Sequence, residues 1–173
     1  MRHFSVHESI TIGAPIERCF ALSTRIELVQ RTLGMTPVTG VTSGHIGENS
    51  RVTWSGWKFG LPTRHHTLIT AFEPPHAGLP NNDHHAATKA AFFQDTQERG
   101  RFAFFQHDHF FLEGIEDVTV LRDEVRFALP FGAVGRFAAK HFLAPYIRKL
   151  ARERFAMIKE LAEGEGWREW VQF

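Results

Sequence analysis

The stretches RFAFFQHDHFFLEG (101–114) and VTVLRDEVRFALP (118–130) decide the fold class of this protein. Apolar and polar residues alternate along both, which is the pattern of strands that bury one face. The stretch AFFQDTQ (91–97) has the same character and is separated from 101–114 by a turn around Gly100. This part of the chain therefore predicts three consecutive antiparallel strands.

The residues before this region predict further strands and two short helices. Alternation over 3–12 suits a half-buried first strand, and a helical spacing of apolar residues follows up to Leu22. A second short helix is expected over 25–31. Residues 36–72 return to strand patterns separated by glycines, which predicts three more strands.

Helical periodicity replaces strand alternation after Phe131. Apolar residues step by three and four from Ile147 to Leu161, which predicts an amphipathic helix. Pro145 favours an interruption, so we expect a short helix over 133–143 and a longer one that begins near Pro145. The complete order is one strand, two short helices, six strands and a long helix, which is an α+β architecture.

The composition indicates one domain with a wide apolar interior. The chain has 173 residues and is 43% hydrophobic, so residues 1–173 fit a single domain. It contains 17 Phe and 4 Trp but one Tyr, and Phe offers a large apolar surface without a hydroxyl that needs a partner. A net charge of +1 predicts no strong attraction to nucleic acid or to an anionic membrane.

The cellular compartment is predicted from cysteine content and hydropathy. Cys19 is the only cysteine, which excludes a disulfide within the chain and favours a reducing compartment. The amino terminus lacks a signal-peptide apolar core, and no run of about 18 apolar residues could span a membrane. We therefore expect a cytoplasmic protein without stable membrane insertion.

Two parts of the chain carry a resemblance to a known family. The stretch ITIGAPIERCFAL (10–22) is similar to that family's opening strand and first short helix. Between 102 and 138 the sequence shows His-x-His-x-Phe at 107–111, Thr-x-x-x-Asp at 119–123 and Pro-Phe-Gly at 130–132. Together they resemble the START and pollen-allergen superfamily, which includes polyketide cyclases and is often labelled SRPBCC.

The resemblance implies a helix-grip fold, in which a curved seven-stranded antiparallel sheet wraps around a long C-terminal helix. It also implies an internal cavity for lipids, sterols, polyketides or other apolar compounds. Residues 76–90 depart from the pattern, because relatives usually pass from the Pro-Pro turn into the next strand within a few residues. We interpret them as an inserted loop that alters the cavity mouth.

The candidate catalytic residues are His109, Asp123 and His107. A turn near Glu116 would place His109 opposite Asp123, and His107 opposite Val125, on neighbouring strands. Such a His-Asp pair could act as a general base on an activated carbon of a polyketide-like ligand. The alternative, which we favour, is a structural hydrogen-bond cluster without catalytic function.

His107 and His109 also share one strand face, so both could bind one metal ion. A stable site needs a third or fourth ligand, which the sequence does not identify. We therefore predict no metal and no other cofactor. His65 and His66 are adjacent on a strand and should point to opposite faces.

The candidate ligand-binding residues are large side chains on expected inward faces of the sheet and helix. Ordinary core packing is the alternative explanation for each of them. Arg64, at the start of a strand, could hold an anionic group at the cavity rim, although a solvated arginine is the simpler interpretation. The predicted lining residues are Trp54, Phe59, Phe72, Phe105, Phe127, Phe142, Tyr146 and Leu150.

The C-terminal region contains an excess of basic residues and an aromatic tail. The helices over 136–163 carry seven Lys or Arg, including Arg154, which we interpret mainly as a solvated outer face. The tail over 165–173 contains Trp167, Trp170 and Phe173, and we expect it to fold back on the domain.

Three functional hypotheses follow from these observations. The leading one is binding or transport of a hydrophobic small molecule by a monomer or homodimer. The second is a cyclase or dehydratase that uses His109 and Asp123. The third is a protein-interaction module with a vestigial cavity, in which 76–90 or the aromatic tail forms the contact surface.

Overall fold

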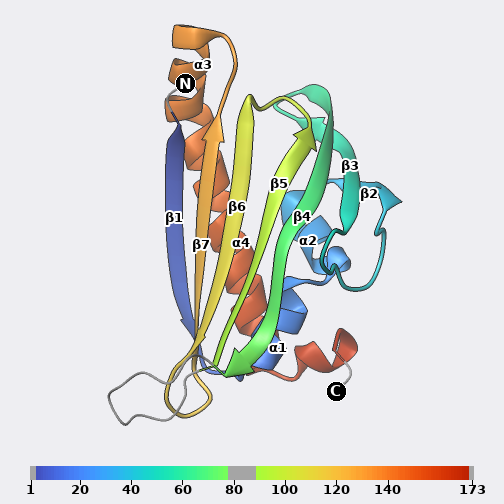
Figure 1. Ribbon diagram of the computed structural model, residues 1–173, viewed down its shortest axis with the longest axis vertical. Helices are drawn as coiled ribbons and strands as arrows, with labels where there is room; N and C mark the ends of the chain where they lie inside the picture. Colours follow the sequence, from blue (N-terminus) through green and yellow to red (C-terminus); the bar gives the residue numbers. More distant parts are fainter. Residues whose placement is uncertain (1–2, 78–88, 172–173) are drawn as a thin grey trace.

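The computed structural model describes residues 3–77 and 89–171 (Figure 1). The chain order is strand, two helices, six strands, and a long helical segment, as the sequence predicts. The strands are β1 (Phe4–Ile12), β2 (Thr36–Gly40), β3 (Arg51–Lys58), β4 (Leu61–Ala77), β5 (Lys89–Arg99), β6 (Phe104–Glu113) and β7 (Thr119–Ala128). The helices are α1 (Ile16–Ser23), α2 (Ile26–Leu33), α3 (Gly132–Ala138), η1 (Ala139–Leu143), α4 (Ala144–Glu163) and η2 (Gly166–Glu169).

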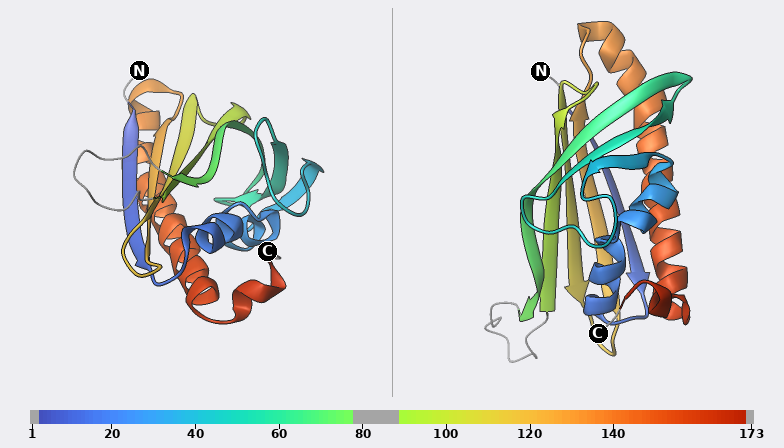
Figure 2. Two further views of the ribbon diagram at one scale, coloured as in Figure 1. Left: turned by 60° about the horizontal axis from the view of Figure 1, so that its bottom comes forward. Right: turned by 90° about the vertical axis from the view of Figure 1, so that its right-hand side faces the viewer.

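The strands form one open antiparallel sheet with the order β1-β7-β6-β5-β4-β3-β2. The sheet curves around α4, and α1 and α2 lie across the same concave side (Figures 1 and 2). This arrangement confirms the predicted helix-grip fold, including the two short helices after the first strand. Every sheet neighbour is antiparallel, so side chains on the concave face of adjacent strands lie directly opposite one another.

The predicted register between β6 and β7 is confirmed. His109 lies opposite Asp123 and His107 lies opposite Val125. The turn between the two strands contains Glu116, whose φ of 57° is typical of a tight reversal. The period-two pattern and the position of this turn were therefore sufficient to pair the two strands correctly.

The predicted start of the longer helix near Pro145 is confirmed, because α4 begins at Ala144. The predicted interruption is wrong, because helical residues continue from α3 through η1 into α4. Pro145 lies in the first turn of α4, where its missing N–H costs least. The π-helical turn η1 directly precedes α4. Hydrogen bonds in a π-helix reach one residue further than in an α-helix, so the chain continues past the missing donor without a break.

The end of the molecule near α1 is filled by a compact aromatic core. The Phe20 ring packs edge-on against Phe72 and Phe111, with centroid separations of 5.3 Å in both pairs. It also contacts Phe93 at 6.0 Å. Ile12, Ile16 and other fully buried residues complete this cluster.

The C-terminal tail folds back on this end as far as Val171, as predicted, and Phe173 lies outside the described residues. Trp167 and Trp170, in and after η2, pack against the core cluster, and Val171 is buried. The guanidinium of Arg18 lies 4.3 Å from the centre of the Trp167 ring. The tail therefore covers the domain with its aromatic side chains up to Val171.

Most of the predicted inserted loop, 78–88, lies outside the described residues. The flanking strand ends, at Ala77 in β4 and Lys89 in β5, are located at the α1 end of the sheet (Figure 1). In the described parts of the chain, every helix is too short or too polar to cross a membrane.

Candidate functional site

A cavity of about 550 Å³ lies between the concave face of the sheet and the helices α2 and α4. The sheet contributes side chains from β3 to β7, and the C-terminal helical segment contributes Ala138 to Arg154. Most of the wall is apolar. The lining extends from Ser23, at the end of α1, to Ala138 of α3 and Phe142 of η1.

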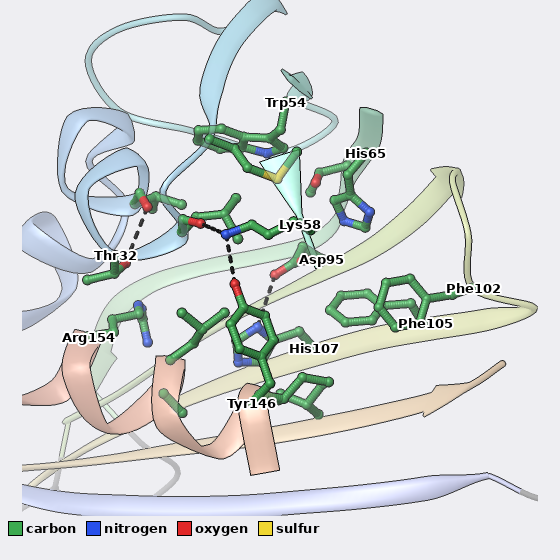
Figure 3. Close-up of a pocket in the computed structure, with 18 of the residues that line it drawn as sticks. Thr32, Trp54, Lys58, His65, Asp95, Phe102, Phe105, His107, Tyr146 and Arg154 are labelled. Atoms are coloured by element: carbon green, nitrogen blue, oxygen red, sulfur yellow. Dashed lines mark hydrogen bonds and ion pairs between the residues drawn. The ribbon is translucent and has the colours of Figure 1, made fainter. Parts of the chain in front are cut away.

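Six of the predicted ligand-binding residues line this cavity. They come from both walls, and Figure 3 shows Trp54 on the sheet side and Tyr146 on the helix side. Phe59 differs from its predicted strand position, because it lies in the β3–β4 turn with a φ of 51°. It nevertheless borders the cavity. The six residues are Trp54, Phe59, Phe105, Phe142, Tyr146 and Leu150.

Phe72 and Phe127 do not line the cavity, and their prediction as lining residues is wrong. Phe72 belongs to the aromatic core near α1. Phe127 lies opposite Phe105 in the sheet but is fully buried beneath Phe4 and Phe102, whose rings lie 5.9 and 6.2 Å from it. Strand parity predicts the face on which a side chain lies, but not which neighbours cover it.

A cluster of charged and polar side chains interrupts the apolar wall. His109 lies between two carboxylates, with Nδ1 3.0 Å from Asp123 and Nε2 3.1 Å from Asp95. His107 has the same relation at longer range, since Nε2 is 3.3 Å from Asp123 and Nδ1 is 3.7 Å from Asp95. The centres of the two imidazole rings lie 3.7 Å apart, and their planes are tilted by 39°. We call Asp95, His107, His109 and Asp123, together with Arg154, the polar cluster.

Arg154 of α4 anchors the polar cluster from the opposite wall. Its Nη1 donates a hydrogen bond of 2.8 Å to Asp123, and only 10% of its side chain is exposed. Figure 3 shows Arg154 on the helix side of the cavity, and His107 and Asp95 on the sheet side. The interpretation of this arginine as part of a solvated outer face is therefore wrong. A buried guanidinium requires an anionic partner, and Asp123 supplies it.

The environment controls the protonation of the polar cluster. Burial alone would raise the pKa of Asp123, but Arg154 and the two imidazoles outweigh it and hold this pKa well below its usual range. The pKa of Asp95 is also lowered, because contacts with His109 and His107 overcome the effect of burial. Burial, followed by the proximity of His109, lowers the pKa of His107. At neutral pH both carboxylates are therefore ionised and His107 is neutral.

Asp95 was not among the site residues predicted from the sequence, and Arg154 was predicted to lie on a solvated face. Asp95 lies directly opposite His107 in the β5–β6 register, on the concave face. In the sequence, Asp95 is an acidic residue in a strand rich in phenylalanine, two residues after the inward-facing Phe93. This spacing places Asp95 on the same face as Phe93. Arg154 was visible as the polar interruption of the apolar helix face. Both residues break an apolar pattern at a position that faces the interior.

The mouth of the cavity combines basic and aromatic side chains. Nζ of Lys58 donates to Oη of Tyr146 at 2.7 Å and to the carbonyl oxygen of Leu33. The Phe59 ring packs edge-on against Tyr146 at 5.0 Å. Arg64, which we considered as a rim residue, lines the cavity and is exposed. Lys58 and Arg64 therefore line the cavity beside the exposed Phe59, whereas Asp123 is buried and paired with Arg154.

His65 and His66 point to opposite faces, as expected for neighbours on a strand. His65 lines the cavity, where its ring lies 5.5 Å from Phe105, and burial lowers its pKa. His66 instead lies outside the cavity lining, with Nδ1 3.1 Å from Oγ1 of Thr53. His65 is thus a neutral polar group beside the polar cluster at physiological pH.

Comparisons with known proteins identify the fold. No family model matches the chain, and no curated protein matches its sequence. Among solved structures, a START superfamily protein from Mycobacterium smegmatis has a TM-score of 0.55 at 13% identity, covering 97% of this chain and 99% of that chain. Norcoclaurine synthase from Thalictrum flavum, in complex with dopamine and hydroxybenzaldehyde, has a TM-score of 0.57 at 12% identity, with coverages of 92% and 86%.

A third similar structure is that of Ara h 8.0201, with a TM-score of 0.56 at 11% identity, covering 93% of this chain and 98% of that chain. At such low identities the similarity concerns the fold. The chain therefore has the helix-grip fold of the START and pollen-allergen superfamily, as the sequence resemblance predicted. Its function must be argued from its own cavity.

Proposed function

We propose that this protein binds a hydrophobic small molecule, lipid-like or polyketide-like, for transport or presentation. The observation that carries the proposal is the cavity of about 550 Å³ with apolar walls and a single deep polar cluster. Small-molecule sites typically measure roughly 300–1,000 Å³ and combine apolar walls with a few convergent polar groups. The apolar body of the ligand would displace water from the walls, and a polar group would be oriented by His107 and Asp95.

The test compares two substitutions of the same type. Leu150→Trp places an indole in the cavity, whereas Leu112→Trp makes the same change at a side chain of β6 that is 53% exposed and does not line it. Native mass spectra of protein purified from its own host would show a retained organic adduct. Binding of the fluorescent probe 1-anilinonaphthalene-8-sulfonate would be titrated in parallel.

Wild type and Leu112→Trp should retain the adduct and bind the probe with similar Kd. Leu150→Trp should lose the adduct and bind the probe at least tenfold more weakly, or about 1.4 kcal/mol. Equal binding by all three proteins would place the probe outside the cavity and overturn the proposal. Absence of both adduct and probe binding in wild type would do the same.

A second candidate function, proton transfer in a cyclase or dehydratase reaction, is favoured by the contact between His109 and Asp123. Asp123 orients the imidazole of His109 through Nδ1, and Nε2 would act as the general base once it has given up its hydrogen bond to Asp95. His107 would contact the same substrate. A suitable probe is an aromatic 1,3-diketone, whose central carbon exchanges its proton for deuterium. NMR should show faster exchange with wild type than with His109→Ala, and equal rates would exclude His109 as the base.

A further inference from the structure

The four imidazole nitrogens of His107 and His109 divide between two carboxylates. His109 Nδ1 and His107 Nε2 face Asp123, at 3.0 and 3.3 Å. His109 Nε2 and His107 Nδ1 face Oδ2 of Asp95, at 3.1 and 3.7 Å. The same oxygen of Asp95 therefore meets one nitrogen from each ring.

Asp123 determines which nitrogens carry protons. Its carboxylate is held ionised by Arg154 and accepts a hydrogen bond from Nδ1–H of His109. It also favours a proton on Nε2 of His107. In neutral imidazoles the remaining nitrogens are then lone pairs. Nε2 of His109 is hydrogen-bonded to Oδ2 of Asp95 in the ion-free protein, so a metal ion would replace the proton that they share. Nε2 of His109, Nδ1 of His107 and Oδ2 of Asp95 would then converge on the ion.

We propose that Asp95, His107 and His109 bind one divalent transition-metal ion. Their ligand atoms all lie within 4.8 Å of one another. Metal bonds of about 2.0–2.2 Å place ligands on one ion roughly 3–3.5 Å apart, so small side-chain movements would close the site. Two imidazoles and one carboxylate are a ligand set for zinc, iron or cobalt, and do not suit calcium or magnesium.

Asp123 and Arg154 are positioning residues in this site. Histidines that bind metals usually donate their other N–H to a carboxylate, which fixes the ring and makes the metal-binding nitrogen more basic. Asp123 has this relation to His109 and lies close to His107. The 2.8 Å hydrogen bond from Arg154 holds Asp123 in place in turn.

The charge and the location of the site fit an ion with free coordination positions. With neutral imidazoles, Asp95, Asp123 and Arg154 leave one net negative charge buried at the cavity wall, and a divalent ion reverses its sign. Asp95 and His107 line the cavity, so the free positions would face a bound molecule. An anionic oxygen donor, such as an enolate or a carboxylate, would neutralise the remaining charge. This last step rests on the proposed ligand binding, whereas the metal site itself does not.

The experiment uses the full untagged chain, stripped with EDTA and titrated with Co²⁺, whose visible absorption reports its ligands. The wild-type protein should bind one equivalent of Co²⁺. The d–d absorption bands of the bound ion should be typical of nitrogen and oxygen ligands. Asp95→Asn and His107→Ala should each weaken binding at least tenfold, and Asp123→Asn should weaken it about 10–100-fold. His66→Ala is the matched control, because His66 lies in the same sheet but outside the cavity lining.

Thermal unfolding of each variant separates loss of the site from loss of the fold. Zn²⁺ should raise the Tm of wild type and of His66→Ala, and leave that of Asp95→Asn unchanged. The near-isosteric Asp95→Asn keeps the packing, so a folded variant without cobalt absorption supports the proposal. Absence of the cobalt spectrum in wild type would overturn it, as would equal binding by wild type, Asp95→Asn and His107→Ala. Failure of probe binding in Leu150→Trp leaves this result unaffected.

Discussion

Both ends of the molecule are built from phenylalanine-rich strands that face helices, but one end is a packed core and the other contains a cavity. Near α1, Phe20 inserts between sheet and helix and closes the space with Phe72 and Phe111. Towards α3, the side chains of the sheet and of the C-terminal helical segment do not fill the space between them, and the cavity remains. The end near α1 is therefore a packed aromatic core, and the other end contains the cavity that we propose binds a ligand.

Truncation of a core phenylalanine should separate the two ends most strongly. Phe111→Ala, in the filled end, should lower the free energy of unfolding by about 3–5 kcal/mol, because the new void cannot collapse. Phe105→Ala, in the cavity wall, should cost roughly 1–2 kcal/mol, because it only enlarges an existing space. Urea denaturation measures both values. Equal losses would indicate that the cavity end is as tightly packed as the core.

Breaking the link between helix and sheet inside the cavity should have a similar effect. Arg154→Ala leaves Asp123 ionised and without its guanidinium, which should destabilise the fold by about 3–5 kcal/mol. The double variant Arg154→Met/Asp123→Asn removes both charges and should recover part of that loss. If the double variant is less stable than Arg154→Ala in urea denaturation, the ion pair does not account for the destabilisation.

The surface ion pairs around the filled end should contribute much less. Arg168 and Glu165 form such a pair near η2, with side chains that are 65% and 78% exposed. Arg168→Ala should therefore change the Tm by no more than about 2 °C, because exposed pairs contribute little in water. A larger decrease would show that the aromatic tail depends on this arginine for its docking.

The smallest effect concerns Cys19, which is fully buried in the filled end. Burial raises its pKa to about 11, so the thiol stays protonated in the folded protein at pH 8. A thiol reagent such as 5,5′-dithiobis(2-nitrobenzoate) should react with unfolded chain only. The free energy of unfolding should fall as pH rises from 9.0 to about 11, because the unfolded thiol loses its proton first. Rapid reaction at pH 8 would show that the filled end opens.

Sequence patterns predicted what depends on local periodicity and failed where three-dimensional neighbours decide. The pairing of His109 with Asp123 follows from strand alternation and one turn, and it is confirmed. Placing Asp95 beside the histidines would also have required the register between β5 and β6. Phe127 has the same parity as Phe105, yet Phe4 and Phe102 cover it. In a curved sheet, the burial of a side chain also depends on how far along the strand it lies. Alternation with a period of two predicts the face of the sheet but not this position.

The most direct test of the account is methyl NMR during titration with 1-anilinonaphthalene-8-sulfonate. Isoleucine δ1-methyl labelling reports both ends at once, since Ile69 and Ile147 line the cavity, whereas Ile12 and Ile16 are buried and do not line it. Binding within the cavity should give saturable shifts at Ile69 and Ile147 and leave Ile12 and Ile16 unchanged. Shifts confined to the exposed Ile115, or equal shifts at both ends, would contradict binding within the cavity.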